Sequence, residues 1–510
     1  PLQLASAVSD APAGSAERAT ALGIFMAQVG TTALFNIDEG ADSKDSKMTR
    51  CTLTQSGLGL PDRDYYFDED KVEKREAYIA HLVRTLDKIS SITGLEPGEA
   101  TAAAAEQIMS LELELAATHL TRTARRDPEL RYNPFTQEEL IAACPGLDWP
   151  AFFSAVGKAN PGSKLIVDCP AALTLACKIL GTAGDERLKP YMWWRVVKSL
   201  SAHLPAAFVH DDFDFFSATL SGTKELKPRW KRALSMTESA LGEALGEMYV
   251  AKHFTQEAKV KAVSIVERVR VALEAKLSSV PWLAPSTREF AVHKMKSFGL
   301  KIGFPDEWKD YTTLEVVRGE HLENVLRARA FEWQLTLNYM DAPTDRSRWL
   351  MLPQMVNAYH YPEMNEIVFP AAILQPPFFN IDADDAVNFA AVGAVTGHEM
   401  THAFDDKGRK YDADGNLTNW WTDEDASEYD SRSAVVVAQA EAFKVHDVAL
   451  NGKLTCGENT ADLGGLKLAY EALEALYAER GEALSGPDAV LTQGFTPQQR
   501  FFLSWAQVWR

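Results

Sequence analysis

Long apolar runs are missing from this sequence of 510 residues. No stretch reaches the roughly 18 consecutive apolar residues that a membrane-spanning helix needs, so the sequence predicts no membrane span. The chain begins at Pro1 without a charged start before an apolar run, so no targeting segment is predicted either.

Cysteine is also scarce. The five cysteines are scattered and form no CxxC pair, which argues against a disulfide framework and against a cysteine-based zinc site. They favour a reducing, intracellular compartment, whereas the glycosylation sequon Asn416-Leu417-Thr418 favours a secreted one.

Positive charge is in deficit, because 52 Lys and Arg face 71 Asp and Glu and leave a net charge of −19. A surface this negative repels phosphate backbones, which excludes nucleic acid as a partner. The ordinary interpretation of the charge is solubility, ahead of an acidic recognition surface. At this length we expect about three folding units and a core that needs no structural metal.

Helical patterns fill residues 68–340. Valines between Val260 and Val269, followed by Leu273, recur at steps of three and four, as on one face of an amphipathic helix. The alanine-rich segment Ala100–Leu120 predicts another helix. Ser286–Glu289 has the pattern of a capping box, opening a helix that ends near Gly299.

The pattern changes near residue 350. Met355–Tyr359 and Glu366–Phe369 predict the two strands of a hairpin. Ala386–Met400 is apolar, too short for a membrane span, and predicts a buried helix. Asp405 to Asn419 is expected to form loops, and a further helix is expected from about Asn459 to Leu476.

His398-Glu399-Met400-Thr401-His402 is an HExxH motif. Residues four apart share one helical face, so both imidazoles can bind one metal ion. A catalytic zinc has three protein ligands and one open place, and a nearby carboxylate must take the proton of the attacking water. The motif therefore predicts two zinc ligands and a general base, Glu399, with a third ligand elsewhere.

Two acids four residues apart, Glu458 and Asp462, are candidates for that third ligand. One can bind the metal while the other acts around it or on the substrate, although two solvated acids on a surface helix would look the same. Gly464-Gly465 beside them offers the small surface that a close helix crossing needs.

An acid that orients a metal-binding histidine is expected as well. Asp405 follows His398 by two helical turns and is expected to accept a hydrogen bond from its non-ligating nitrogen. Asp406 can serve instead, and either can be an acid at a helix end.

Several longer motifs are similar to those of the neprilysin-like zinc endopeptidases, and the resemblance covers most of the chain. Those that carry it are Leu58–Tyr66, Leu220–Arg232, Asn357–Tyr359, Asn365–Ala371, Leu374–Phe379, Gly397–Glu399, Asn419–Asp423, Gly457–Gly465 and Gln499–Leu503. The resemblance implies a mainly helical fold of two lobes around a central cavity, with the HExxH helix in a thermolysin-like catalytic lobe.

The same resemblance implies roles for single residues. Glu458 is the third zinc ligand, Glu399 the general base, and Asp462 the acid that orients a later histidine. Asn357 and Ala358 form the edge that hydrogen-bonds the substrate backbone. The apolar pocket for the residue after the cleaved bond is formed by Ile373, Phe378, Val395 and Trp509.

The chain departs from the family pattern in three ways. The partner histidine and a substrate-gripping arginine lie beyond the residue matched by Trp509, and this chain stops at Arg510. The catalytic region is therefore interpreted as truncated at its C-terminus. His360 stands where the family usually has tyrosine, and Thr460 where isoleucine is common.

We therefore expect a helical N-terminal region, residues 1–345, and a zinc-binding catalytic region, residues 346–510. The predicted function is a metalloendopeptidase with one zinc per chain that cleaves oligopeptides before hydrophobic residues. The alternative is a zinc-binding, inactive or weakly active peptide-binding relative. A structural zinc protein is disfavoured because it gives Glu399 no role. The resemblance favours an extracytoplasmic location, and the oligomeric state is left open.

Overall fold

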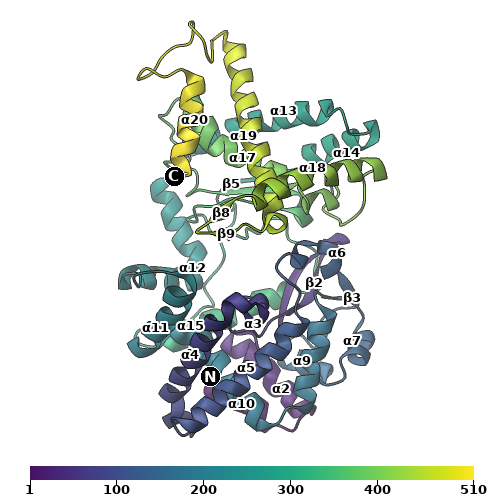
Figure 1. Cartoon of the computed structure of the whole chain (residues 1–510), viewed down its shortest axis with the longest axis vertical. Coiled ribbons are helices and arrows are strands. Elements are labelled where there is room, and N and C mark those ends of the chain that lie inside the picture. The colour runs from purple at the N-terminus through teal and green to yellow at the C-terminus, as the bar shows by residue number, and fades with distance from the viewer. The chain divides into compact units, whose positions relative to one another are not determined.

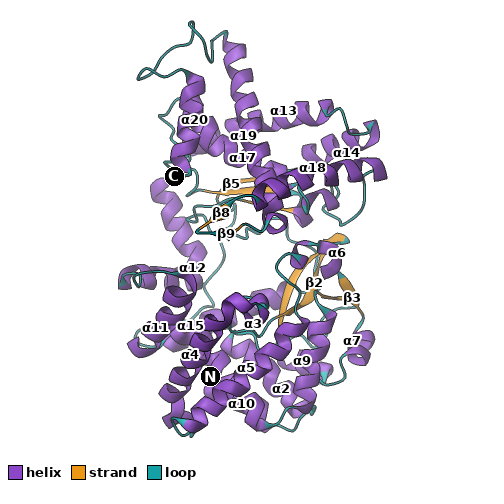
Figure 2. Cartoon of the chain, in the orientation of Figure 1, coloured by secondary structure: helices purple, strands orange, loops and turns teal.

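Helices make up most of the computed structural model, which describes residues 1–510 (Figure 2). The predicted mainly helical fold with small β elements is confirmed. The chain divides into two units: the first holds residues 1–42, 47–240 and 311–344, and the second holds residues 43–46, 241–310 and 345–510.

The division differs from the single boundary expected near residue 345. Residues 241–310 belong to the second unit, and the chain passes into it inside one long helix, α12 (Arg229–His253). Only Leu241 leaves the helical conformation there, with φ −135° and ψ 40°.

The first unit consists mostly of helices, with a four-stranded sheet at one side of them (Figure 1). Its helices, with the first part of α12, are α1 (Leu2–Asp10), α2 (Ala16–Val29), α3 (Asp64–Phe67), α4 (Val72–Thr93), α5 (Glu99–Thr118), α6 (Pro128–Arg131), α7 (Gln137–Ala143), α8 (Trp149–Ala155), α9 (Pro170–Thr182), α10 (Asp185–Leu200), α11 (Ala206–Asp212) and α15 (His321–Tyr339). Short 3₁₀ and π turns are η1 (Glu69–Lys71), η2 (Ala124–Arg126), η3 (Ser201–His203) and η4 (Phe213–Thr219).

The sheet of this unit has the order β1-β2-β4-β3, with strands β1 (Phe35–Asp42), β2 (Asp45–Gln55), β3 (Asn133–Phe135) and β4 (Leu165–Val167). β2 and β4 run parallel, with Cys51 opposite Leu165, and β3 pairs antiparallel with β4. Helix α5 confirms the helix expected from the alanine-rich segment. Its residues Ile108, Leu111 and Leu115 are fully buried in the core of the unit.

The second unit contains the HExxH motif. Its helices, with the end of α12, are α13 (Gln256–Ser279), α14 (Pro285–Lys296), α16 (Asp385–Asn388), α17 (Ala394–His402), α18 (Asp423–Glu441), α19 (Gly452–Arg480) and α20 (Pro497–Val508). Its strands are β5 (Gly299–Gly303), β6 (Tyr359–Tyr361), β7 (Glu366–Pro370), β8 (Lys444–Val445) and β9 (Val448–Ala449), and its short turns are η5 (Pro362–Met364), η6 (Phe389–Gly393) and η7 (Gly408–Lys410).

Two local expectations for this unit need correction. Helix α14 begins at Pro285 with Ala284 as its cap, so Ser286 does not open a capping box. Instead, the Asp425 carboxylate of α18 accepts a hydrogen bond from the Ala284 amide at 3.0 Å, a long-range contact that no local pattern reveals. The predicted hairpin forms between β6 and β7, but its first strand starts at Tyr359 rather than Met355.

The predicted buried helix is present as a continuous helical run from α16 through the π turn η6 to α17. It packs against α19, which begins at Gly452 and so includes Glu458. The two helices nearly touch at Gly397 and Gly465: a Cβ on Gly465 would lie 2.6 Å from the Ala394 carbonyl oxygen. This confirms the expected role of Gly465 in a close helix crossing.

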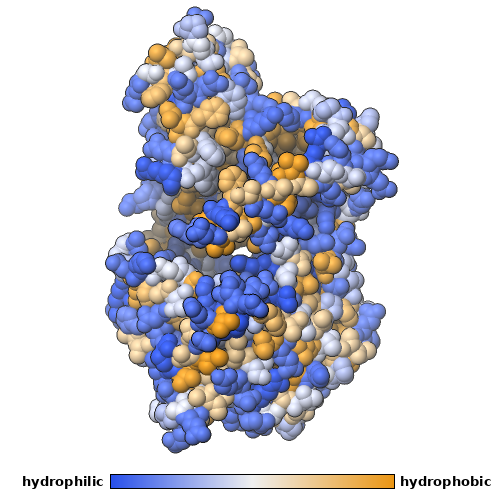
Figure 3. All heavy atoms as spheres, viewed as in Figure 1, coloured by the Kyte–Doolittle hydropathy of each residue, from blue (hydrophilic) through white to orange (hydrophobic).

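No helix of the structure has both the length and the apolar composition that crossing a membrane requires. Hydrophilic residues are spread over the visible face of each unit, with smaller apolar groups between them (Figure 3). All five cysteines are buried, and none of them forms a disulfide bond.

Candidate metal centre

His398 and His402 lie one turn apart on α17, and their Nε2 atoms are 2.9 Å from each other. Glu458, on α19, places its Oε2 atom 3.4 Å from the first of these nitrogens and 3.5 Å from the second. These are the three residues whose donor atoms converge closely enough to hold one metal ion. Ligand atoms of a tetrahedral zinc, with bonds of about 2.0–2.1 Å, lie roughly 3.4 Å apart, so the donor set fits.

Each histidine also contacts a carboxylate through its other ring nitrogen. His402 Nδ1 lies 2.8 Å from Asp405 Oδ2, and His398 Nδ1 lies 2.8 Å from Asp462 Oδ1. Such contacts fix which nitrogen carries the proton and leave Nε2 free for a metal.

Asp405 was expected to contact His398, and this expectation is wrong. The helix ends at His402, and the chain turns so that Asp405 reaches back three residues to His402 instead. The amides of Lys407 and Gly408 donate to the other carboxylate oxygen of Asp405 at 2.9 and 2.6 Å. The turn therefore holds this buried acid rigidly beside the histidine.

The pKa values of the histidines and of Glu458, in the absence of a metal, reflect these contacts. Burial lowers the pKa of His398, but hydrogen bonds to Asp462 and Glu458 outweigh it and raise that pKa to about 9. Hydrogen bonds to both histidines hold the pKa of Glu458 far below its usual range. Three carboxylates around two imidazoles thus create a site that attracts a cation.

Glu399 lies on the same helix and is only 6% exposed. Burial raises the pKa of its carboxyl to about 7, against the opposing effect of the two histidines and of the His360 backbone amide. A carboxylate with a pKa near neutrality can accept and release protons under physiological conditions.

A cavity of 170 Å³ adjoins His398, Glu399 and Asp462. It is lined by five of the six residues predicted for substrate binding, namely Asn357, Ile373, Phe378, Val395 and Trp509. Ala358, the sixth, is buried and directly precedes β6. The Phe378 and Trp509 rings meet edge to face with centroids 5.9 Å apart.

The same cavity contains residues that sequence reasoning missed: Val356, Ala394, Leu466 and Trp505. Trp505 lies one helical turn before Trp509 on the chain, and Leu466 directly follows the glycine of the helix crossing. The helical spacing from a residue already assigned to the pocket was the available signal for Trp505.

Two family models match the chain. Residues 3–305 match the N-terminal model of peptidase family M13, and residues 357–510 match the peptidase family M13 model that follows it. The chain belongs to peptidase family M13. The neprilysin-like resemblance seen in the sequence is thereby confirmed.

The sequences of known proteins are similar to this one along nearly its whole length. Human endothelin-converting enzyme 1 is 35% identical over 499 residues, which cover 96% of this chain and 64% of that enzyme. A homologue from Locusta migratoria is 34% identical over 494 residues, which cover 93% of this chain and 67% of the homologue. The chain thus spans about two thirds of the length of these relatives.

Solved structures of other proteins have a similar fold. The Mycobacterium tuberculosis zinc metalloprotease Zmp1, in complex with an inhibitor, matches with a TM-score of 0.92 and 37% identity over 100% of this chain and 76% of its own. PepO from Lactobacillus rhamnosis has a TM-score of 0.83 at 23% identity over 97% of this chain and 75% of its own, which supports the fold alone.

Proposed function

We propose that this chain is a zinc-dependent endopeptidase that hydrolyses oligopeptides on the N-terminal side of hydrophobic residues. The observation that carries the proposal is the convergence of His398, His402 and Glu458 beside a buried Glu399. Membership of family M13 supports it, as does the similarity to a protein named as a zinc metalloprotease.

One zinc ion held by these three residues would lower the pKa of water and polarise a peptide carbonyl. Glu399 then takes a proton from the attacking water and delivers it to the departing amine. Asp405 and Asp462 keep the imidazoles in orientation, since each accepts from an Nδ1 atom.

The substrate backbone is proposed to pair with the chain at Asn357 and Ala358, which precede strand β6 at an edge of its three-stranded sheet. Strand addition of this kind supplies affinity through main-chain hydrogen bonds. The side chain after the cleaved bond enters the cavity lined by Ile373, Phe378, Val395 and Trp509. An extracytoplasmic location stays a prediction that rests on the family resemblance.

One substitution distinguishes a general base from a zinc ligand at position 399. Glu399→Gln keeps the size and polarity of the side chain but cannot accept a proton. We expect its zinc content to equal that of the wild type, while the rate of peptide cleavage falls by about 10²–10⁴ or more. Loss of zinc together with activity would make Glu399 a ligating or structural residue.

A zinc-loaded wild-type chain that binds peptides without cleaving them would favour the inactive, peptide-binding alternative. That outcome is measured on the same samples, by comparing peptide binding with peptide hydrolysis.

A further inference from the structure

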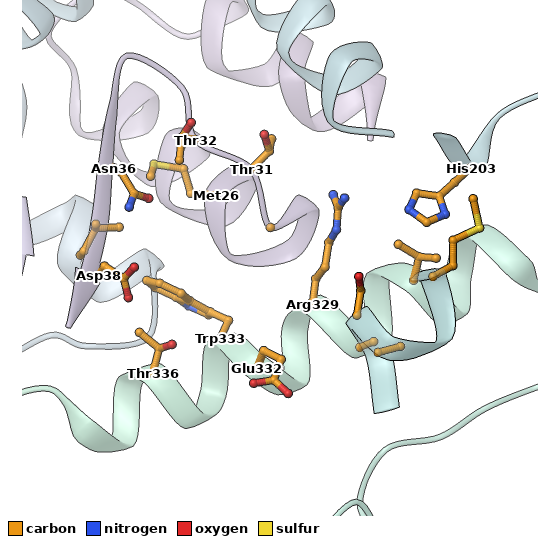
Figure 4. A pocket seen from close by; sticks show the side chains of 17 residues that line it. Met26, Thr31, Thr32, Asn36, Asp38, His203, Arg329, Glu332, Trp333 and Thr336 are labelled. Carbon is orange, nitrogen blue, oxygen red and sulfur yellow. The ribbon is translucent and has the colours of Figure 1, made fainter. Parts of the chain in front are cut away.

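A second cavity, of 380 Å³, lies within the first unit and away from the HExxH motif in sequence (Figure 4). Its walls come from α2, β1, η3, the first part of α12 and α15. Its volume is within the roughly 300–1,000 Å³ of small-molecule sites. Met26, Met236 and Trp333 contribute apolar side chains to its lining.

The cavity contains an arginine without a carboxylate partner. Arg329 Nη1 donates to the Val29 carbonyl and to Ser199 Oγ, and Nη2 donates to the Ser199 carbonyl, each at 2.9 Å. A guanidinium has five N–H donors, so the Nε–H and one Nη2–H make no bond to the protein. Burial lowers the pKa of this group, and no acid opposes the effect.

Two open N–H donors on one guanidinium match the two oxygens of a carboxylate. His203 lies on the same side of the cavity as Arg329 (Figure 4), and its Nδ1 is 3.2 Å from His321 Nε2. Burial, Arg329 and His321 lower the pKa of His203 to about 4, so this ring is neutral near pH 7 and Arg329 supplies the charge. An incoming carboxylate would pair with a cation that the protein itself leaves uncompensated.

The end of the cavity opposite Arg329 carries negative charge. Asp38 lies beside the Trp333 ring, on the far side from His203, while Glu332 points from α15 away from the Arg329 guanidinium (Figure 4). From Arg329 to Thr336 the cavity follows about two turns of α15, roughly 10 Å at 1.5 Å per residue. An extended tripeptide has about the same length, at 3.3–3.6 Å per residue.

We propose that this cavity binds a short peptide of about three residues, with its C-terminal carboxylate on Arg329, its last side chain against Met26 and Met236, and its ammonium group toward Asp38. The ligand class follows from the separation of the charged groups and from the apolar side chains in the lining. The site lies outside the metal centre and does not depend on the reaction proposed there.

The test is calorimetric titration with the tripeptide Gly-Ala-Leu, using the zinc-loaded Glu399→Gln variant as background so that the peptide is not consumed. Met236→Glu adds a carboxylate to the lining that Met236 shares with Arg329, and it does not remove the contacts that Arg329 makes with Val29 and Ser199. We expect it to weaken binding at this site at least about tenfold, because the added carboxylate repels the carboxylate of the peptide and competes with it for Arg329. Met236→Leu is the matched control and should bind as the background does.

The role of the terminal carboxylate of the peptide is tested by the same titration. Gly-Ala-Leu amide lacks the terminal charge and should bind at least about tenfold more weakly than the free acid. Equal binding by Met236→Glu, equal binding of the amide, or no saturable binding up to millimolar peptide would each overturn the proposal. If Glu399→Gln still cleaved the peptide, the proposed reaction would fail, while the comparison between the Met236 variants would remain valid.

Discussion

Asp462 Oδ1 lies 2.8 Å from His398 Nδ1, and Asp462 is one helical turn after Glu458 on α19. One face of one helix therefore supplies both a candidate ligand and the carboxylate that orients another ligand. The family resemblance assigns Asp462 to the orientation of a later histidine, and the contact with His398 adds a second role.

This contact predicts an effect of Asp462 on metal affinity. Asp462→Ala removes the acceptor of the His398 ring proton, and we expect zinc affinity to fall by about 10–100-fold. Asp462→Asn keeps a carbonyl acceptor and should lose less. Competition with a fluorescent zinc chelator measures both variants. Unchanged affinity in Asp462→Ala would mean that this carboxylate does not support the metal site.

The helix crossing gives a second prediction. A Cβ on Gly465 would meet the Ala394 carbonyl oxygen and the His398 amide nitrogen at 2.6 Å, so Gly465→Ala must push α17 and α19 apart. We expect a loss of about 1–3 kcal/mol in unfolding free energy together with weaker zinc binding.

Gly393→Ala is the control for this change. Its added Cβ would find only ordinary contacts, the nearest at 3.5 Å, in a helical backbone. Alanine is favoured over glycine in helices by roughly 0.5–1 kcal/mol, so this variant should be neutral or more stable. Thermal denaturation with matched zinc analysis compares the two, and equal effects would contradict the crossing as the cause.

Lys294 supports the turn that follows the HExxH helix. Its buried ammonium group donates to the carbonyls of Ala403, Gly408 and Tyr411, each at 2.7 Å. Lys294→Met removes these three hydrogen bonds, although the Gly408 carbonyl still accepts from the Tyr411 amide and the Tyr411 carbonyl from Trp420 Nε1. We expect a loss of about 1.5–3 kcal/mol of stability. Lys296→Met, two residues later at a largely exposed site, should change chemical denaturation little; a similar loss in both variants would refute the role of Lys294.

The substrate pocket predicts cleavage specificity. Burial of an apolar side chain is worth about 1.5–3 kcal/mol, enough to favour Phe or Leu after the cleaved bond about tenfold or more over small polar residues. Phe378→Ala should reduce kcat/KM for such peptides, while Phe502→Ala, at an exposed ring, should not. A peptide-library digest dominated by charged residues at this place would contradict the assignment of the pocket.

The sequence was informative wherever a fixed spacing on one helix determines the geometry. His398 and His402 share a face because they are four residues apart, and the same spacing places Glu458 and Asp462 together on α19. The glycine beside them marked the helix crossing correctly.

Long-range and turn geometry could not be predicted in this way. The partner of Asp405 depends on how the chain turns after His402, and the cap of α14 depends on Asp425, which is distant in sequence. The open donors of Arg329 had no sequence signal, because its contacts come from Val29 and Ser199. Such sites emerge only when separate helices are packed together.

The most direct measurement is the zinc content of the purified protein, by elemental analysis of the wild type, Glu399→Gln and His402→Ala. With His398, His402 and Glu458 as ligands, we predict one zinc per chain in the first two proteins and a large loss in the third. Full retention of zinc by His402→Ala would contradict the metal centre and, with it, the proposed reaction.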